Sequence, residues 1–281
     1  MQQNDIRALA SAAERGRLLA LEGVHAAASG HTGGSLSVMD ILTTLYFHTM
    51  KINPADPKAA DRDRLVMSKG HCTPGLYAVL ALKGYFPAEE MKLFRSIEGH
   101  YSGHPDMTHV KGVDMSTGSL GQGISAAVGM AMVGKMDDKD YRVYAILGDG
   151  ELDEGQVWEA TMAAAKYNLD NLCAVVDVNG LQIDGTTADV MPTEPLDKKF
   201  EAFGWHVIHV DGHDVGALAE AFEAAKAVKG CPTVLLARTV KGKGVSFMEG
   251  DYGWHGKAPN DEQYERAEAE VRARLAELEG N

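Results

Sequence analysis

The segment RVYAILGDGELDEG, residues 142–155, joins an apolar run to an acidic, glycine-rich turn. A second apolar run over 172–177 ends just before Asn179, which lies 30 residues after Asp149 (179 − 149 = 30). A strand–helix–strand unit of that length returns both side chains to the carboxyl edge of one parallel sheet. The sequence therefore predicts strands over 142–147 and 172–177, with a helix over 154–168 between them.

The same alternation of strand and helix continues along the chain. Further strands are predicted over 65–68, 205–210 and 233–237, and further helices over 6–28, 35–48, 74–83, 122–135, 195–203 and 214–228. Strands with apolar, uncharged interiors are typical of a parallel sheet that is covered on both faces. The predicted fold is α/β: a doubly wound, mostly parallel sheet with helices on both faces. Because no linker or repeat interrupts it, we expect one domain over 1–281, with the charged segment 260–279 as a packing or solvated helix.

Composition argues against several classes of partner and site. Lys and Arg number 27 and Asp and Glu 40, so the formal charge is 27 − 40 = −13, which disfavours nucleic acid and anionic membrane surfaces. Cys72, Cys173 and Cys231 show no CxxC spacing, which argues against a disulfide framework or zinc site and favours a reducing compartment. The N-terminus resembles an amphipathic helix rather than a signal peptide, and we expect a cytoplasmic location.

Oxygen ligands gather at the predicted sheet edge. Asp149 and Asn179 offer side-chain oxygens, and the carbonyl of Leu181 adds a third. With two diphosphate oxygens and a water, these ligands would complete the octahedron that Mg²⁺ requires. Gly150 lets the backbone approach a phosphate, and the helix that follows contributes its positive end. The alternative is an ordinary turn with a surface aspartate.

Two nucleotide-binding motifs come close to matching. The segment Gly129 to Met136 differs by one residue from a P-loop, but the hydroxyl that would bind Mg²⁺ is missing and the segment lies within a predicted helix. The turn after Leu147 lacks the GxGxxG spacing of a dinucleotide fold. Its carboxylates would also repel a pyrophosphate unless a divalent cation lay between them. The turn therefore favours a metal with a diphosphate over NAD.

Four histidines lie beside glycine in predicted loops: His31, His71, His104 and His255. His104 falls in the long Gly-, His- and Ser-rich stretch 98–123, which is typical of a functional loop. Histidines in such settings can donate to oxyanions and move protons near neutral pH, although any one alone would more often be ordinary. The other histidines lack this setting and are not assigned to the site: His25, His48, His100, His109, His206, His209 and His213. Lys69 and Lys241 could pair with phosphate or a sugar hydroxyl, or be solvated.

The motifs resemble those of a known family. GDGELDEG (148–155) with NGLQIDG (179–185) is similar to the diphosphate and Mg²⁺ motif of thiamine diphosphate enzymes. Five further segments resemble motifs of one family in particular, the transketolases. They are SGHTGG (29–34), SKGH (68–71), GHPD (103–106), TGSLGQG (117–123) and WHGK (254–257). The similarity runs from about residue 11 to residue 258.

The resemblance implies a role for each matching residue at the diphosphate end. Asp149, Asn179 and the Leu181 carbonyl would bind Mg²⁺, or Ca²⁺ or Mn²⁺ in its place. Gly150 and Glu151 would approach the diphosphate of the thiamine diphosphate cofactor. His71 and His255 would contact the phosphates or the reactive end of the cofactor, with Lys69 and Lys241 nearby.

The resemblance also implies roles around the rest of the cofactor. Gly118, Ser119 and Leu120 would form the wall that faces the aminopyrimidine, and many relatives have proline where Ser119 stands. His31, His104 and His255 would surround the substrate hydroxyls and assist proton transfers. Glu154 matches a family position at a subunit interface.

Transketolases transfer a two-carbon ketol unit from a ketose phosphate to an aldose. The resemblance covers their N-terminal, pyrophosphate-binding domain, whereas the glutamate that protonates the aminopyrimidine belongs to the domain that follows. It therefore implies an N-terminal subunit of a split transketolase that works on sugar phosphates with a separate chain carrying the pyrimidine-binding and C-terminal domains, as α₂β₂. The alternatives are half of a deoxyxylulose-phosphate synthase, the α subunit of a 2-oxo acid dehydrogenase, or a non-catalytic regulatory subunit that retains the fold.

Overall fold

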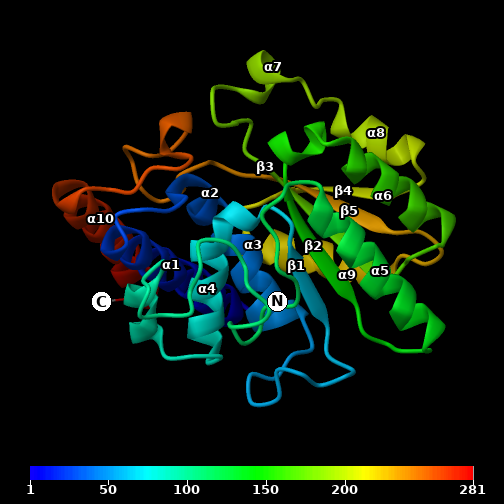
Figure 1. Cartoon of the computed structure of the whole chain (residues 1–281), viewed down its shortest axis with the longest axis horizontal. Helices are drawn as coiled ribbons and strands as arrows, with labels where there is room; N and C mark the ends of the chain where they lie inside the picture. The colour runs from blue at the N-terminus through cyan, green and yellow to red at the C-terminus, as the bar shows by residue number, and fades with distance from the viewer. Residues whose placement is uncertain (281) are drawn as a thin grey trace.

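The computed structural model describes residues 1–280, which contain a five-stranded sheet in the order β1-β2-β3-β5-β4 (Figure 1). The strands are β1 Arg64–Met67, β2 Val143–Gly148, β3 Leu172–Val178, β4 His206–Asp211 and β5 Thr233–Arg238. Every neighbouring pair is parallel, so all five carboxyl ends lie at one edge of the sheet. This confirms the predicted parallel α/β fold.

Helices cover both faces of the sheet. One face carries α5 Gln122–Met136, α6 Gly155–Lys166 and α8 Leu196–Ala202, and the other carries α1 Gln3–Ala26, α3 Met39–Thr44, α4 Thr73–Lys83 and α9 Val215–Ala227 (Figure 1). Because successive side chains of a strand point to opposite faces, β2 packs against the helices on both sides of the sheet. Val143, Ala145 and Leu147 pack towards α5 and α6, whereas Tyr144 and Ile146 pack towards α4 and α9.

The region predicted as one helix over 35–48 is divided into shorter pieces. It begins earlier, as α2 Thr32–Ser37, continues as α3, and ends in a π-helical turn, η1 Leu45–Thr49. Ser37 Oγ donates to the Gly34 carbonyl at 3.0 Å and to a buried carboxylate at 2.6 Å, which is a tertiary interaction that a helical period cannot reveal. The boundaries of the other predicted helices and strands differ by a few residues at most.

Short elements complete the chain. They are η2 Gly70–Cys72, η3 Ala88–Leu93, η4 Gly150–Asp153, α7 Thr187–Val190 and η5 Tyr252–Trp254. The predicted loop over 98–123 has no helix or strand before α5 begins. Among residues 1–280, no helix combines the length and the apolar character needed to cross a bilayer.

The C-terminal helix α10, Asp261–Glu279, is a packing helix that lies along α1 (Figure 1). Asn260 and Gln263 form a capping box at its start, which satisfies amide groups that a helix end leaves unpaired. Its two buried side chains, Ala267 and Val271, pack in the same cluster as Leu21. The charged face therefore stays solvated while a narrow stripe holds the helix in place.

Candidate functional site

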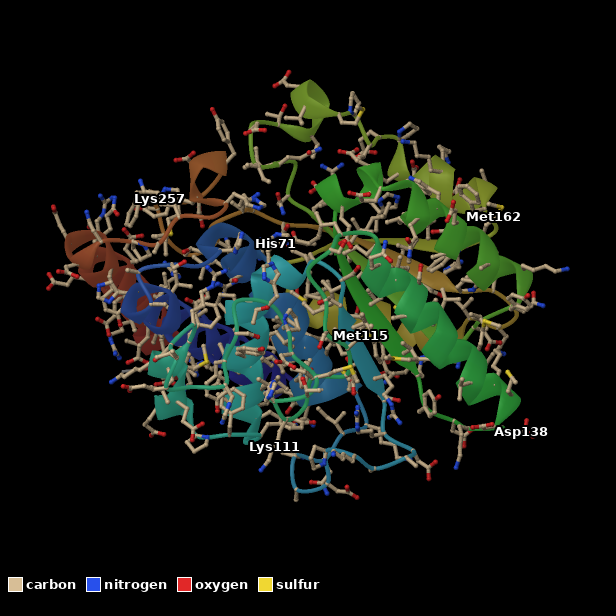
Figure 2. All side chains as sticks on the ribbon, in the orientation of Figure 1. His71, Lys111, Met115, Asp138, Met162 and Lys257 are labelled. Carbon is tan, nitrogen blue, oxygen red and sulfur yellow. The ribbon has the colours of Figure 1, made fainter. Side chains whose placement is uncertain are left out.

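The predicted site residues meet at the carboxyl edge of the sheet. Segments that follow β1, β2, β3 and β5 line a cavity of about 100 Å³ there. Figure 2 shows His71 where α2 and α4 approach this edge. The predicted residues that line the cavity are Lys69, His71, Leu120, Asp149, Gly150, Glu151, Asn179, Leu181, Lys241 and His255.

The three proposed metal ligands lie together. Asp149 accepts hydrogen bonds from the amides of Gly150 at 2.9 Å and Gly180 at 2.6 Å. Asn179 Oδ1 accepts from the amide of Leu181 at 3.2 Å. The Leu181 carbonyl accepts from a lysine ammonium at 3.1 Å, and a carbonyl has a second lone pair left for another ligand.

A buried carboxylate that the sequence did not reveal, Asp177, lies beneath this edge. It follows Cys173 and Val175 at the two-residue strand period, so it faces the α2 side of the sheet. Its carboxylate pairs with Lys69 and accepts hydrogen bonds from the hydroxyls of Ser37 and Thr239. Burial raises the pKa of Asp177, but the ammonium of Lys69 more than offsets this and holds the pKa below its usual value.

Lys69 therefore has a partner inside the protein. Burial lowers the pKa of its ammonium, but Asp177 more than reverses this, so the pKa of Lys69 is raised and the side chain is charged. Lys69 also lines the cavity, so a phosphate contact stays a prediction. Its main contact is with Asp177.

Asp149 has no such partner, because over residues 1–280 it forms no ion pair. Only 3 % of its surface is exposed, and burial, followed by the nearby charge of Asp177, raises its pKa to about 6. A buried carboxylate without a counter-charge is costly, and a divalent cation would remove that cost. The described chain has no cluster of three His, Cys, Asp or Glu side chains suited to a metal. A single carboxylate with amide and carbonyl oxygens is instead a donor set that fits Mg²⁺.

Glu151 and Glu154 differ in their surroundings. The Glu151 carboxylate accepts from the amides of Gly121 at 3.0 Å and Gly148 at 3.1 Å, and from the hydroxyl of Ser68. It thus ties the ends of β1 and β2 to the start of α5, and burial raises its pKa. Glu154 is exposed at the start of α6 and does not line the cavity, so its interface role stays a prediction.

The four predicted histidines form one cluster. The ring of His31 has its centroid 5.3 Å from that of His71, 5.4 Å from that of His255 and 6.0 Å from that of His104. The rings of His71 and His255 stack at 4.9 Å. The four histidines that the sequence singled out therefore come together in the fold from four separate segments of the chain.

Burial keeps this cluster uncharged. It lowers the pKa of His31 to about 4, with Arg95 adding to the shift, and that of His255 to about 3, with Lys241 adding to it. Burial is also the main reason why the pKa of His71 falls well below its usual value. Neutral imidazoles have one donor and one acceptor nitrogen. Among the described residues, the buried His31 Nδ1 has no hydrogen-bond partner.

The segment predicted to face the aminopyrimidine passes beside the cluster. Gly118 has a φ of +149°, and a Cβ there would lie 2.9 Å from Cδ2 of His104. Leu120 lines the cavity, whereas Ser119 is exposed. Only glycine lets the chain pass His104 this closely.

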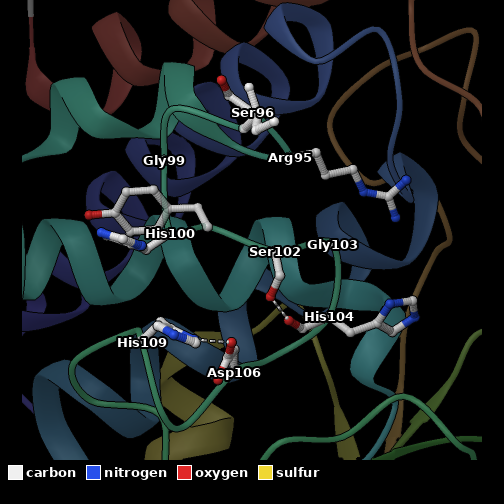
Figure 3. Close-up of a pocket in the computed structure, with 11 residues that line it drawn as sticks. Arg95, Ser96, Gly99, His100, Ser102, Gly103, His104, Asp106 and His109 are labelled. Carbon is white, nitrogen blue, oxygen red and sulfur yellow. Dashed lines mark hydrogen bonds and ion pairs between the residues drawn. The ribbon is translucent and has the colours of Figure 1, made fainter.

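Arg95 is a second residue that the sequence did not single out. It lines an open cavity of about 640 Å³ together with His104, and Figure 3 shows both side chains extending to the same side. Its guanidinium donates to Ser29 Oγ at 2.7 Å and lies against Gly103, where a Cβ would clash with Nε. The pKa of His104 is lowered by burial and then by this cation.

A sequence family described as "Transketolase, thiamine diphosphate binding domain" matches residues 9–273. The chain belongs to this transketolase family. The match agrees with the predicted family and with thiamine diphosphate as the cofactor type. A 6-deoxy-6-sulfo-D-fructose transketolase subunit of Clostridium sp. is 49 % identical over 91 % of this chain and 93 % of its own. One of the subunits of the apulose-4-phosphate transketolase of Phocaeicola vulgatus is 44 % identical over 95 % of this chain and 94 % of its own.

Longer transketolases match over part of their length. The human transketolase is 44 % identical over 91 % of this chain and 40 % of its own. The transketolase structure from Campylobacter jejuni superimposes with a TM-score of 0.89 and 33 % identity, over 99 % of this chain and 46 % of that one. The chain thus spans about half the length of the transketolase structures it matches. These matches confirm the thiamine diphosphate-binding α/β fold and the prediction of a transketolase subunit.

Proposed function

We propose that this chain is the N-terminal, cofactor-anchoring subunit of a two-chain transketolase. Such an enzyme transfers a two-carbon ketol unit from a ketose or ketose phosphate donor to an aldose acceptor. The observation that carries the proposal is the neutral cluster of His31, His71, His104 and His255 beside the Asp149–Asn179 edge. It is supported by two relatives named as subunits, which align over 93 % and 94 % of their lengths.

At the diphosphate end, the chain supplies three oxygen ligands for Mg²⁺, or for Ca²⁺ or Mn²⁺ in its place. These are the carboxylate of Asp149, Oδ1 of Asn179 and the Leu181 carbonyl. When bound, thiamine diphosphate supplies the carbon nucleophile that accepts and releases the two-carbon unit. The cation compensates the buried charge of Asp149, and Lys241 Nζ adds a positive charge next to the Leu181 carbonyl.

At the substrate end, the histidines act as hydrogen-bond partners and proton carriers. Lys241 Nζ lies 3.1 Å from His255 Nδ1, so the ammonium donates to that nitrogen and the proton of His255 stays on Nε2. His31 Nδ1 has no partner among the described residues and can accept from, or donate to, a sugar hydroxyl. Neutral rings that both donate and accept can exchange protons with hydroxyls without building up charge.

The assembly belongs to the same proposal. We propose a separate partner chain with the pyrimidine-binding and C-terminal domains, an α₂β₂ arrangement, and action of residues 1–281 as one domain. A cytoplasmic location is supported by three cysteines that form no disulfide, two of them buried. The sugars named for the two relatives, 6-deoxy-6-sulfo-D-fructose and apulose 4-phosphate, are the first donors to test.

The experiment is a reconstitution. The chain, its candidate partner, thiamine diphosphate and Mg²⁺ are mixed with a ketose phosphate and an aldose, and the ketose product is measured. We expect ketol transfer from the mixture and none from either chain alone. Equal activity from this chain by itself would contradict the two-chain proposal.

The alternatives predict different products. Pyruvate in place of the ketose phosphate should be inert, whereas a deoxyxylulose-phosphate synthase or a 2-oxo acid dehydrogenase would decarboxylate a 2-oxo acid. A regulatory subunit would tolerate Asp149→Ala without loss of activity in the assembled complex. We expect that substitution to abolish Mg²⁺-dependent cofactor binding instead.

A further inference from the structure

The turn after β5, residues 239–242, holds several parts of the site together. We call it the β5 turn. Its side chains and backbone contact the site at four points: the Thr239 hydroxyl on Asp177, Lys241 Nζ on the Leu181 carbonyl and near His255 Nδ1, and the Gly242 amide on the Gly33 carbonyl at 2.9 Å. A shift of this turn would therefore move a positive charge and disturb both walls of the cavity.

The middle of the β5 turn is fixed by a histidine that sequence analysis left unassigned. The amide of Val240 donates to His213 Nε2 at 2.8 Å. His213 Nδ1 lies 2.7 Å from Oδ2 of Asp40. Since a backbone amide is always a donor, Nε2 accepts and the ring proton sits on Nδ1, where it is donated to Asp40.

Asp40 is itself held by a buried charge network. Its carboxylate pairs with Arg17, whose Nη1 also donates to Glu14 at 2.7 Å. Burial raises the pKa of Asp40, but Arg17 and the hydrogen bond from His213 together more than offset this, so the pKa is lowered and the carboxylate is anionic. The network joins α1 and α3 to the loop after β4. His213 is thus supported from the helical layer and reaches across to the β5 turn.

We propose that His213 is a positioning residue: by accepting the Val240 amide it holds the β5 turn in the geometry that keeps Lys241 at the Leu181 carbonyl and at His255. The side chain lies outside the cavity and does not line it. The consequence for cofactor binding rests on the proposed function, whereas the hydrogen bond itself can be tested without it.

Two substitutions test separately the hydrogen bonds made by the two ring nitrogens of His213. In His213→Asn, the amide occupies the place of Nδ1 and can still donate to Asp40, but it cannot reach Val240. In His213→Gln, the longer side chain places an oxygen near the position of Nε2 and can accept from Val240. If His213 only supported Asp40, the Asn variant would behave like wild type.

The test is residue-resolved hydrogen exchange of the Val240 amide, with melting temperature as a measure of overall stability. We expect His213→Asn to speed the exchange of Val240 by about tenfold or more, equivalent to about 1.4 kcal/mol, and His213→Gln to stay near wild type. The exchange of amides in β2 should not change. Unchanged exchange in His213→Asn, or equal exchange in both variants, would overturn the proposal.

The functional arm measures thiamine diphosphate binding in the presence of Mg²⁺ by calorimetry, with the partner chain added. We expect His213→Asn to weaken binding about tenfold relative to His213→Gln at equal melting temperature. The matched control is His206→Asn. His206 is exposed at the start of β4, the strand that precedes His213, and its substitution should change neither readout.

If Val240 is deprotected but both variants bind the cofactor equally, the positioning role is refuted. If the wild-type complex binds no thiamine diphosphate, the proposed function fails, while the exchange of Val240 still decides the hydrogen bond.

Discussion

Lys69 and Asp177, 108 residues apart in the chain, form an ion pair in which the side chains are 2 % and 0 % exposed. The charge of Asp177 adds to burial in raising the pKa of Asp149, and over residues 1–280 Asp149 has no ion-pair partner of its own. Asp149 and Asp177 repel each other, and the one ammonium of Lys69 is paired with Asp177. The arrangement therefore favours a second cation at the Asp149 side.

The first prediction concerns this pair. Lys69→Met leaves Asp177 charged and buried without a counter-charge, so we expect a loss of about 3–5 kcal/mol in the free energy of unfolding at pH 7. Adding Asp177→Asn removes the stranded charge, and its one amide oxygen can still accept from one of the two hydroxyls that bond the carboxylate, Ser37 on Oδ2 or Thr239 on Oδ1. The double variant should therefore be more stable than Lys69→Met alone. Urea unfolding measures both, and a double variant that is less stable than the single one would refute the argument.

The second prediction is a pH dependence caused by Asp149. Burial raises its pKa from an ordinary 3.8 to about 6, so between these values the folded chain holds a proton that the unfolded chain has released. The contribution of this group to stability therefore falls as pH rises from about 4 to about 6. For a shift of about two pKa units the decrease is about 3 kcal/mol.

This dependence is isolated by comparison with Asp149→Asn, which does not titrate. Without divalent cation, wild type should lose about 3 kcal/mol relative to the variant between pH 4 and pH 7. Urea unfolding at both pH values measures the difference. With saturating Mg²⁺ and thiamine diphosphate the difference should disappear or reverse, because the charged wild-type carboxylate binds the cation more tightly than a neutral amide does. A constant difference across the pH range would contradict the raised pKa.

The third prediction concerns the charge that Arg95 places beside the histidine cluster. Its cation lowers the pKa of both His31 and His104, in each case second to burial. Arg95→Met should therefore raise both pKa values without bringing either above the ordinary value of a histidine. Nitrogen-15 NMR titration of the histidine rings measures this directly.

The sequence allowed part of this site to be predicted, for a clear physical reason. Asp149 and Asn179 follow two consecutive strands, so their spacing in the chain determines their proximity in space. The remaining contacts join segments distant in the chain: Asp177 meets Lys69 over 108 residues, and His213 meets Asp40 over 173. Neither the spacing of apolar residues along a helix or strand nor the residues of a turn can predict such pairs. The same tertiary contacts divide the helix predicted over 35–48, because Ser37 turns towards Asp177.

The last prediction uses glycine to test how closely the chain must pass the cluster. A Cβ at Gly118 would lie 2.9 Å from Cδ2 of His104, and the residue has a φ of +149°, which side chains disfavour. Gly118→Ala should therefore displace His104 and lower kcat/KM of the assembled enzyme by at least about tenfold, or about 1.4 kcal/mol of transition-state stabilisation. The matched control is Gly129→Ala within α5, where a Cβ meets nothing within 4 Å. Since alanine favours helix, the control should keep full activity and gain up to about 1 kcal/mol in stability. Equal activity in the two variants would show that the 118–120 segment can move away from His104 at no cost to the reaction.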